Sequence, residues 1–483
     1  MTCIAILGTS SNCGKSTIVT LLCRYLRNIG LNVTPFKPQN MSLNSTSTWY
    51  GEEIAYIQYI QSKVCNIKAT SYINPILIKP YEYNRSEVIV LGEAKYFTKP
   101  EKYYQTIIEK LRDVVTLSYK ILNRKFDIVV MEGAGCVYEP NLEDVDIANL
   151  EIIKKFEDVK IILVSDIYYG GSFTSLYGTY ICLPEYVRRK VVGFIINKFC
   201  GDSKILEPAL EWLKRKTGRE VLSILPLSED LNIFPEDSVS LSKIYNPNAK
   251  IDIAIIYYPY ISNFGEFSLL AHHPEISIRF VYKPSEIGEP DLLVLPGCRN
   301  TFKALEYLKK LEFDKKIKKI VGSIPIIGIC AGYQILSKKI SDPTGLETGT
   351  PTHAKGLSLL NLEFRYSSRK VVARVKAISS INNIEIEGFK IHRGMPIKNN
   401  EESLYMVVRE NTEDVSYLEG SLNEKYKIYG TTIHETLLNL KLLSKIIDRN
   451  LMYSNNGVEY IYRILIEKLD RYVKYVNFVK DLI

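Results

Sequence analysis

The amino-terminal half of the chain alternates short apolar runs with longer segments of helical spacing. The segment at 16–30 places its apolar residues as an amphipathic helix does. The apolar runs are predicted to be strands buried on both faces, at 3–7, 32–36, 126–131, 160–166 and 191–197. Repetition of strand and helix in this order predicts a parallel sheet that is covered by helices on both faces.

The same alternation returns in the second half of the chain after a polar break. The stretch at 235–250 contains Asn-Pro-Asn and predicts a linker. Further strands are predicted at 251–259, 291–297, 323–330, 369–378 and 425–434. We therefore expect an α/β protein with two doubly wound domains, at 1–240 and 250–445, followed by a helical tail at 446–483.

Composition narrows the class of protein. Apolar residues make up 46% and charged residues 24% of the chain, which is ordinary for a globular protein. The net charge of +8 is spread along the chain, so we expect no nucleic-acid partner. Nine cysteines without a C-x-x-C pair indicate a reducing compartment. No signal-like leader and no apolar stretch of about 18 residues is present, which predicts a cytoplasmic enzyme that does not span a membrane.

The decapeptide GTSSNCGKST at 8–17 follows the first predicted strand and opens the first predicted helix. Backbone N–H groups of such a loop surround phosphate oxygens, so we expect Thr9 and Gly14 to line an ATP site. Lys15 would reach the outer phosphates, and the Ser16 hydroxyl would bind Mg²⁺. The loop is one residue longer between its glycines than the common motif. A chance Gly-Lys-Ser at a helix start is the alternative.

A nucleotide site also needs an acidic partner for the metal. Glu132 ends the strand predicted at 126–131, on the same sheet edge as the loop, and is the first candidate Mg²⁺ ligand. Its alternative role is that of a capping carboxylate at a helix start. Glu53 is a second, weaker candidate for the metal.

Three motifs of this half, GTSSNCGKS, EGAG and IINK, resemble the dethiobiotin synthetase-like branch of P-loop proteins. The resemblance implies that ATP is used to phosphorylate a carboxylate or a carbamate. It also implies that Asn197 contacts the adenine edge, although a side chain that caps the strand end is an equal alternative.

The second half carries GICAGYQ around Cys330, which resembles the nucleophile turn of class I glutamine amidotransferases. A sharp strand-to-helix turn presents the thiol, and side chains at the flanking positions would crowd it, which explains the glycines. A helix start also favours thiolate. The expected oxyanion donors are the backbone N–H groups of Ala331 and Gly297. A small buried cysteine at a helix start is the alternative.

A cysteine nucleophile needs a base, and the chain has five histidines. His434 follows a predicted strand downstream of the cysteine, in the order typical of the family, and is the expected base. His392, in GFKIHRG, is expected to form a wall of the site. Many class I amidotransferases have His-x-Glu, whereas here Glu435 directly follows the histidine. Neighbouring residues of a strand point to opposite faces, so the group that orients His434 is not identified.

Four longer motifs, PFKPQNMSLNS, YINPILIKP, EGAGCVYEPNLEDVDIANL and IINKFCGD, resemble the cobyric acid synthase family over nearly the whole chain. The resemblance implies ATP- and glutamine-dependent amidation of carboxylates b, d, e and g of adenosylcobyrinic acid a,c-diamide. Acyl phosphates and ammonia released at Cys330 would be the intermediates. The expected substrate loop, for which an ordinary polar turn is the alternative, comprises Lys37, Gln39, Asn40, Ser42, Asn44 and Ser45.

The chain departs from the family pattern at two arginine positions, which are Tyr169 and Cys200 here. This leaves the details of substrate binding open. A related amidase, the cobyrinic acid a,c-diamide synthase, remains an alternative, and a ParA-like regulatory ATPase with an inactive glutaminase domain is a more distant one. The order of the amidations, the ammonia path and the oligomeric state are not determined by the sequence.

Overall fold

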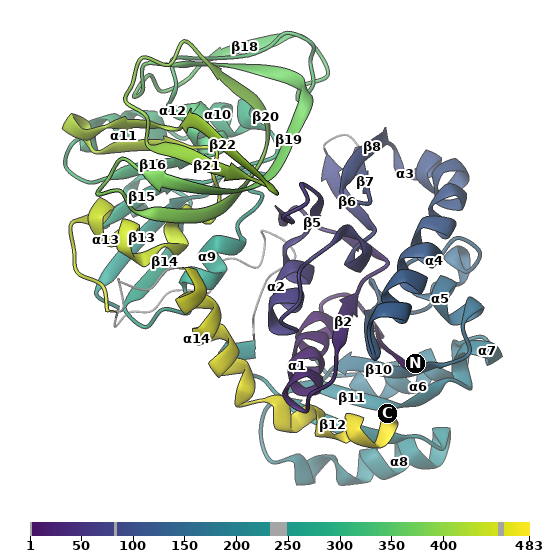
Figure 1. Ribbon diagram of the computed structural model, residues 1–483. Helices are drawn as coiled ribbons and strands as arrows, with labels where there is room; N and C mark the ends of the chain where they lie inside the picture. Colours follow the sequence, from purple (N-terminus) through teal and green to yellow (C-terminus); the bar gives the residue numbers. More distant parts are fainter. Residues whose placement is uncertain (1, 82–84, 232–248, 453–457) are drawn as a thin grey trace. The chain divides into compact units, whose positions relative to one another are not determined.

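The computed structural model describes residues 2–81, 85–231, 249–452 and 458–483 (Figure 1). The described residues form two compact units. Unit 1 contains residues 2–42, 57–231 and 466–483, and unit 2 contains residues 43–56, 249–452 and 458–465. The two predicted α/β domains are confirmed, whereas most of the predicted linker at 235–250 lies outside the described residues.

Unit 1 is built on a six-stranded parallel sheet with the order β12-β11-β10-β1-β9-β2. The five predicted strands are all present, and their apolar side chains are buried, as expected for a sheet covered on both faces. The chain leaves the central strand β1 toward one edge and returns to its other side, so a ligand crevice is expected at its carboxyl end. The strands are β1 (Thr2–Gly8), β2 (Val33–Phe36), β9 (Ile128–Glu132), β10 (Val159–Asp166), β11 (Val191–Phe199) and β12 (Glu220–Pro226).

Helices cover this sheet, and the predicted carboxy-terminal tail contributes to the cover. Helix α1 packs against the sheet and against η10 (Val473–Leu482), while α4 packs on α5 and α6 on α8. Asp470 at the end of α14 accepts two hydrogen bonds from the Arg24 guanidinium, at 2.7 and 2.8 Å. The helices are α1 (Lys15–Asn28), α2 (Tyr56–Val64), α3 (Pro100–Lys102), α4 (Ile108–Lys125), α5 (Leu150–Lys155), α6 (Ser172–Cys182), α7 (Glu185–Arg188), α8 (Glu207–Thr217) and α14 (Val458–Asp470).

A second, smaller sheet of unit 1 follows the order β3-β6-β7-β8. The polar segment after β2 enters this sheet as its first strand, and Lys37, just before that strand, reaches Glu132 at the end of β9 with its side chain. Its strands are β3 (Gln39–Met41), β6 (Ile76–Tyr81), β7 (Arg85–Val90) and β8 (Glu93–Thr98).

Unit 2 contains a six-stranded sheet with the order β14-β13-β15-β16-β24-β23, parallel except at its β23 edge. Its strands are β13 (Ile251–Ile256), β14 (Ile276–Val281), β15 (Leu292–Leu295), β16 (Ile326–Ile329), β23 (Ser421–Asn423) and β24 (Ile428–Thr431). The helices of this unit are α9 (Gly265–Leu270), α10 (Thr301–Lys310), α11 (Phe313–Ile320), α12 (Ala331–Leu336) and α13 (Leu440–Ile447).

A mainly antiparallel sheet, which the sequence did not predict, completes unit 2, with a parallel pair between residues 339–341 and 363–365. The run at 369–378 forms a strand as predicted, but it belongs to this sheet and not to the parallel one. Along the strand at 363–379, buried positions alternate in part with exposed ones, as expected for a sheet with one solvent-exposed face. The strands are β17 (Lys339–Asp342), β18 (Thr352–Lys355), β19 (Glu363–Ser379), β20 (Glu385–Ile397), β21 (Tyr405–Glu410) and β22 (Glu413–Glu419).

The compact units differ from the predicted ranges at two places. The hairpin of β4 (Ser45–Ser47) and β5 (Glu53–Ala55) belongs to unit 2, although it lies within the range 1–240. The tail is also divided, since residues up to 465 belong to unit 2 and 466–483 to unit 1. No helix in the described part of the chain is both long and apolar enough to cross a bilayer.

Candidate active sites

The phosphate loop of unit 1 runs from the end of β1 to the start of α1. Gly14 precedes the helix with φ +99°, and a Cβ at this position would lie 1.9 Å from Asn197 Nδ2. That Nδ2 donates to Cys13 O at 2.9 Å, so the end of β11 fastens the loop. Thr9 Oγ1 donates to Ser165 Oγ on β10 at 3.1 Å. Only glycine fits at position 14, and the loop is held by both neighbouring strands.

Lys15 lies within this loop and is buried. Its Nζ donates to Ser10 O at 2.9 Å and to Gly135 O at 2.8 Å. Two neutral carbonyl oxygens hold the ammonium in place without cancelling its charge. The side chain can therefore exchange these contacts for phosphate oxygens, which are stronger acceptors.

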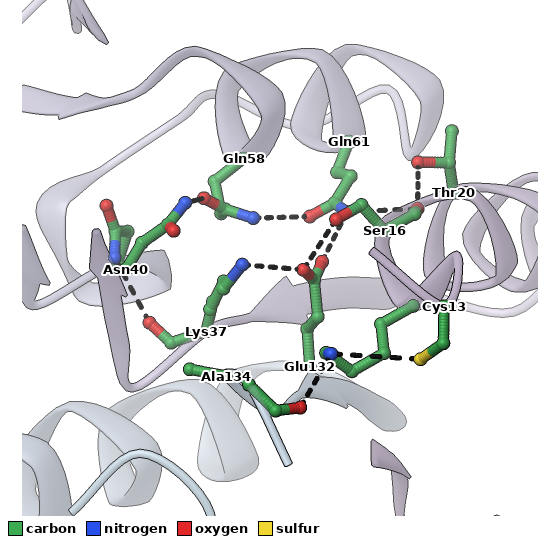
Figure 2. A network of polar contacts seen from close by, with 12 residues as sticks. Cys13, Ser16, Thr20, Lys37, Asn40, Gln58, Gln61, Glu132 and Ala134 are labelled. Carbon is green, nitrogen blue, oxygen red and sulfur yellow. Dashed lines mark hydrogen bonds and ion pairs between the residues drawn. The ribbon is translucent and has the colours of Figure 1, made fainter. Parts of the chain in front are cut away.

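The Glu132 carboxylate is the centre of a buried polar network at the same sheet edge (Figure 2). Oε1 accepts from Ser16 Oγ and from Lys37 Nζ, both at 2.7 Å. Oε2 accepts from Gln61 Nε2 at 3.0 Å. The network continues from Gln61 to Gln58 and Asn40, as Figure 2 shows. The predicted residues Ser16 and Glu132 are thus brought together, and Lys37 balances the buried carboxylate charge.

The donors at this point fit Mg²⁺. A hydroxyl and a carboxylate lie 2.7 Å apart beside a phosphate loop, and Mg²⁺ characteristically takes one or two protein oxygens together with water and phosphate oxygens. Glu53, the second metal candidate, belongs to unit 2, where its carboxylate pairs with Lys370 Nζ at 2.5 Å and accepts from Ser45 Oγ at 2.9 Å. Its contacts give the predicted metal role no support.

The predicted substrate loop is divided between the two units. In unit 1, Lys37 contacts Glu132, Gln39 accepts from the Tyr103 hydroxyl, and Asn40 Nδ2 donates to Gln58 Oε1 at 2.8 Å. The Ser42 N–H donates to Ile78 O at 3.1 Å. Asn44 belongs to unit 2, where its Oδ1 accepts from the Gly265 N–H at 3.1 Å.

Cys330 occupies a strained turn between β16 and α12 in unit 2. Its φ of 54° and ψ of −106° are unfavourable for a residue with a side chain and cost about 1–3 kcal/mol. A Cβ at Gly332 would lie 1.9 Å from Leu295 O, and one at Gly328 would lie 2.7 Å from the Gly332 backbone. The flanking positions thus have no room for a side chain, although the clash would be with the backbone and Leu295 and not, as expected from the sequence, with the thiol.

His434 lies just beyond β24 and is held by β20. Its backbone and that of Phe389 exchange two hydrogen bonds, at 2.8 and 3.3 Å, and the two rings stack at 4.9 Å. A Cβ at Gly297 would lie 3.0 Å from His434 Cε1 and 3.6 Å from Cys330 Cβ. The structure therefore brings together the predicted nucleophile, the predicted base and the turn that carries a predicted oxyanion donor.

Glu266 at the start of α9 is the residue that sequence reasoning missed. Its Oε1 lies 3.4 Å from His434 Nδ1, and both side chains are buried. No motif marks this glutamate, and it lies far upstream of the histidine in the sequence. Only the packing of α9 against the segment after β24 brings the two together.

The two buried histidines have opposite electrostatic environments. Burial lowers the pKa of His434, but hydrogen bonds and charge interactions with the Cys330 and Glu266 side chains outweigh that effect and raise the pKa to about 9. Burial and the Lys390 charge lower the pKa of His392 to about 3, so this ring is neutral and its Nδ1 can donate to Gly394 O at 2.9 Å. Such a difference separates a proton-carrying histidine from a structural one. The carbonyl oxygen of Ile391, the residue before His392, accepts from Cys330 Sγ at 3.6 Å, so the predicted wall residue His392 follows a residue in contact with the thiol.

Comparison with known proteins finds two family domains along the chain. Residues 4–241 match the CobQ/CobB/MinD/ParA nucleotide binding domain, and residues 252–441 match the CobB/CobQ-like glutamine amidotransferase domain. A nucleotide-binding domain joined to a glutamine amidotransferase domain defines a glutamine-dependent amide ligase.

Relatives of almost full length specify the family. The cobyric acid synthase of Desulforamulus reducens is 38% identical over 452 residues, which cover 91% of this chain and 88% of that protein. That of Clostridium botulinum strain 657 is 40% identical over 92% of this chain and 90% of its own length. The probable cobyric acid synthase of Methanosarcina barkeri is 39% identical over 99% and 96%. The chain belongs to the cobyric acid synthase family.

The close fit at Gly332 generates a first prediction. Gly332→Ala places a methyl group against Leu295 O, so we expect a loss of glutamine hydrolysis and a lower Tm, as measured by glutamate release and thermal unfolding. Gly178→Ala is the matched control, because a Cβ there meets nothing within 4 Å and alanine favours a helix by about 1 kcal/mol. Full glutaminase activity in Gly332→Ala would contradict the geometry of the turn.

The raised pKa of His434 generates a second prediction. An imidazolium that persists up to about pH 9 favours the neighbouring thiolate, so iodoacetamide should alkylate Cys330 about tenfold faster in the native protein than in His434→Gln at pH 7. The difference should shrink as the pH rises through about 9, where the imidazolium loses its proton. Mass spectrometry of the Cys330 peptide separates this thiol from the other eight cysteines. Equal rates at pH 7 would refute the pairing.

Proposed function

We propose that the protein amidates the peripheral carboxylates b, d, e and g of adenosylcobyrinic acid a,c-diamide, with ATP and glutamine, to give adenosylcobyric acid in cobalamin biosynthesis. The observation that carries the proposal is one chain with two reactive centres, a phosphate loop beside Glu132 and a strained Cys330 beside His434. The motif at 35–45 and the cobyric acid synthase relatives support this choice of acceptor. The protein would act in the cytoplasm on small molecules, without nucleic acid.

Unit 1 would activate the carboxylate. The acceptor carboxylate attacks the γ-phosphate of ATP, ADP leaves, and the resulting acyl phosphate reacts with ammonia to give an amide and inorganic phosphate. Backbone N–H groups of the loop and the Lys15 ammonium would stabilise the charge of the transferred phosphoryl group. A Mg²⁺ ion held by Ser16 and Glu132 would neutralise further phosphate charge. Phosphorylation is needed because the oxygen of a free carboxylate is a very poor leaving group.

The remaining predicted residues of unit 1 would bind and orient the reactants. Thr9 and Gly14 line the loop, and Asn197, which already fastens that loop, would also reach the adenine edge. Lys37, Gln39 and Asn40 follow β2 toward the Glu132 network, where they would face the carboxylate as it is phosphorylated. Side chains that are already hydrogen-bonded in place lose little conformational entropy when a substrate binds.

Unit 2 would release ammonia from glutamine. His434 takes the proton of Cys330, and the thiolate attacks the side-chain amide carbon of glutamine. The N–H groups of Ala331 and Gly297 would stabilise the oxyanion, and the proton on His434 would pass to the leaving ammonia. Water then hydrolyses the thioester, which restores the thiol and releases glutamate.

The acceptor is tested by incubating the protein with ATP, glutamine and each of two corrinoids. We expect adenosylcobyrinic acid a,c-diamide to gain four amides, counted by mass spectrometry, with one ATP consumed for each amide. Cobyrinic acid amidated only at positions a and c would instead identify the alternative amidase. If neither corrinoid gains an amide, the proposed acceptor is wrong.

A third prediction separates the two half-reactions. Cys330→Ala should lose glutamine-dependent amidation but keep amidation with ammonium chloride, because only the source of ammonia is removed. Lys15→Ala should lose both activities, because no acyl phosphate forms. Both are measured as amides added to the corrinoid. Glutamine-dependent activity in Cys330→Ala would refute the assignment of the nucleophile.

A further inference from the structure

The segment Leu43–Tyr56 precedes most of the nucleotide-binding domain in sequence, yet it is part of unit 2. Its polar residues at 44–48 are buried, as is Glu53. Buried polar groups need partners, and Asn263, Gly265 and Arg374 of the amidotransferase unit supply several of them. Two groups of these contacts involve the immediate neighbours of Glu266 and of His434 in the sequence.

The first contact holds the loop before Glu266. Asn44 Oδ1 accepts from the N–H of Gly265, the residue next to Glu266, at 3.1 Å. Asn263 Oδ1 accepts from the Ser45 N–H at 3.2 Å and from Ser45 Oγ at 3.1 Å, and its own N–H donates to Leu43 O at 3.2 Å. The loop that carries Glu266 is thus tied to the segment by four hydrogen bonds.

The second contact holds the residue after His434. Glu435 has a left-handed φ of 66°, and its buried carboxylate accepts from the Tyr56 hydroxyl at 2.8 Å and from Arg374 Nη1 at 3.0 Å. Arg374 in turn donates to Ser47 O at 2.9 Å and to Thr46 Oγ1 at 3.1 Å. Two of the hydrogen-bond donors to Glu435 therefore belong to the segment or are held by it, and the Tyr462 hydroxyl of α14 is a third donor, at 3.4 Å.

The Tyr56 ring connects the two contacts. A Cβ at Gly265 would lie 2.4 Å from this ring, so ring and loop are in close contact. The same side chain thus packs against Gly265, the neighbour of Glu266. Its hydroxyl donates a hydrogen bond to Glu435, the neighbour of His434. A rigid aromatic side chain at this place fixes the spacing between the two.

We propose that Leu43–Tyr56 is a positioning element of the glutaminase centre, which holds Glu266 and Glu435 so that Glu266 orients the His434 imidazole toward Cys330. The inference rests on the glutaminase half of the proposed function. Glu266 Oε1 faces Nδ1 at 3.4 Å, which leaves Nε2 as the ring nitrogen for the thiol. Glu435 serves as the anchor of the backbone, and this explains why the usual His-x-Glu spacing is absent.

Glu266→Gln tests the orienting role with almost no change of shape. We expect the kcat for glutamine hydrolysis to fall about tenfold to a hundredfold, with KM unchanged, because the amide cannot stabilise the imidazolium. Ammonia-dependent amidation should be unchanged, which shows that the variant is folded. Unchanged kcat for glutamine would overturn the proposal.

The pH dependence of Cys330 alkylation is a readout that a purely structural role would not move. Loss of the Glu266 charge should lower the His434 pKa in Glu266→Gln. Cys330 of this variant should therefore be alkylated faster than Cys330 of His434→Gln only up to a lower pH than in the native protein. The other titratable groups that face this pair are Cys330, His392, Glu435, Tyr405 and Tyr56, all of which the substitution leaves in place. An unshifted profile would overturn the orienting role.

Tyr56→Phe tests the segment by removing one hydroxyl. Glu435 then loses one of its hydrogen bonds, so we expect the kcat for glutamine hydrolysis to fall about tenfold with KM nearly unchanged. Tyr50→Phe is the matched control in the same segment, because Tyr50 is exposed, and it should behave as the native protein. A lower Tm of Tyr56→Phe with unaltered kcat would show that the segment only stabilises the fold.

Asn44 provides an independent check of the first contact. Asn44→Ala removes the acceptor for the Gly265 N–H and should lower glutamine hydrolysis about tenfold, whereas Asn44→Asp keeps an acceptor oxygen and should recover part of the loss. Glutamate release is measured directly and without a corrinoid. If the native protein releases glutamate but amidates no corrinoid, the proposed acceptor is wrong and the present inference is unaffected. If both Asn44 variants release glutamate as fast as the native protein, the positioning role of the segment is overturned.

Discussion

A buried guanidinium holds the centre of unit 2 together. Arg374 lies on β19, is 1% exposed, and donates to the hairpin of β4 and β5 and to the carboxylate of Glu435. Removing a cation from water costs several kcal/mol, and only a matched carboxylate with further hydrogen bonds offsets that cost. The antiparallel sheet, the hairpin and the residue after His434 are therefore held in one arrangement, since a shift of any one of them would leave a buried charge without its partner.

The two candidate sites use buried charge in different ways. In unit 1, Lys37 balances the charge of Glu132, and the Gln61 amide donates to the second oxygen of that carboxylate. In unit 2, Glu266 and Cys330 together raise the pKa of His434, so this histidine is set to hold a proton. The first arrangement balances a buried carboxylate with a cation, while the second strengthens the hold of a histidine on its proton.

The sequence predicted the local features of the protein well and the non-local ones poorly. The strands, the glycine at position 14 and the glycines around Cys330 follow from backbone geometry within a few residues, and the structure confirms them. Glu266, Arg374 and the place of Asn44 depend on contacts between residues far apart in the chain. Single-sequence periodicity contains no information on such pairs, and the antiparallel sheet at 339–419 was missed for the same reason.

Leu43–Tyr56 belongs to unit 2, whereas the residues on either side of it in the sequence belong to unit 1. This arrangement limits where the gene could be divided into two functional parts. A gene split at the boundary between the two family matches, near residue 245, would give an amidotransferase fragment that lacks the hairpin holding Glu435 and Asn263. Fusion, fission or exchange of halves at that boundary would thus separate residues that form one unit. An exchange that keeps these contacts has to carry the hairpin with the carboxy-terminal half.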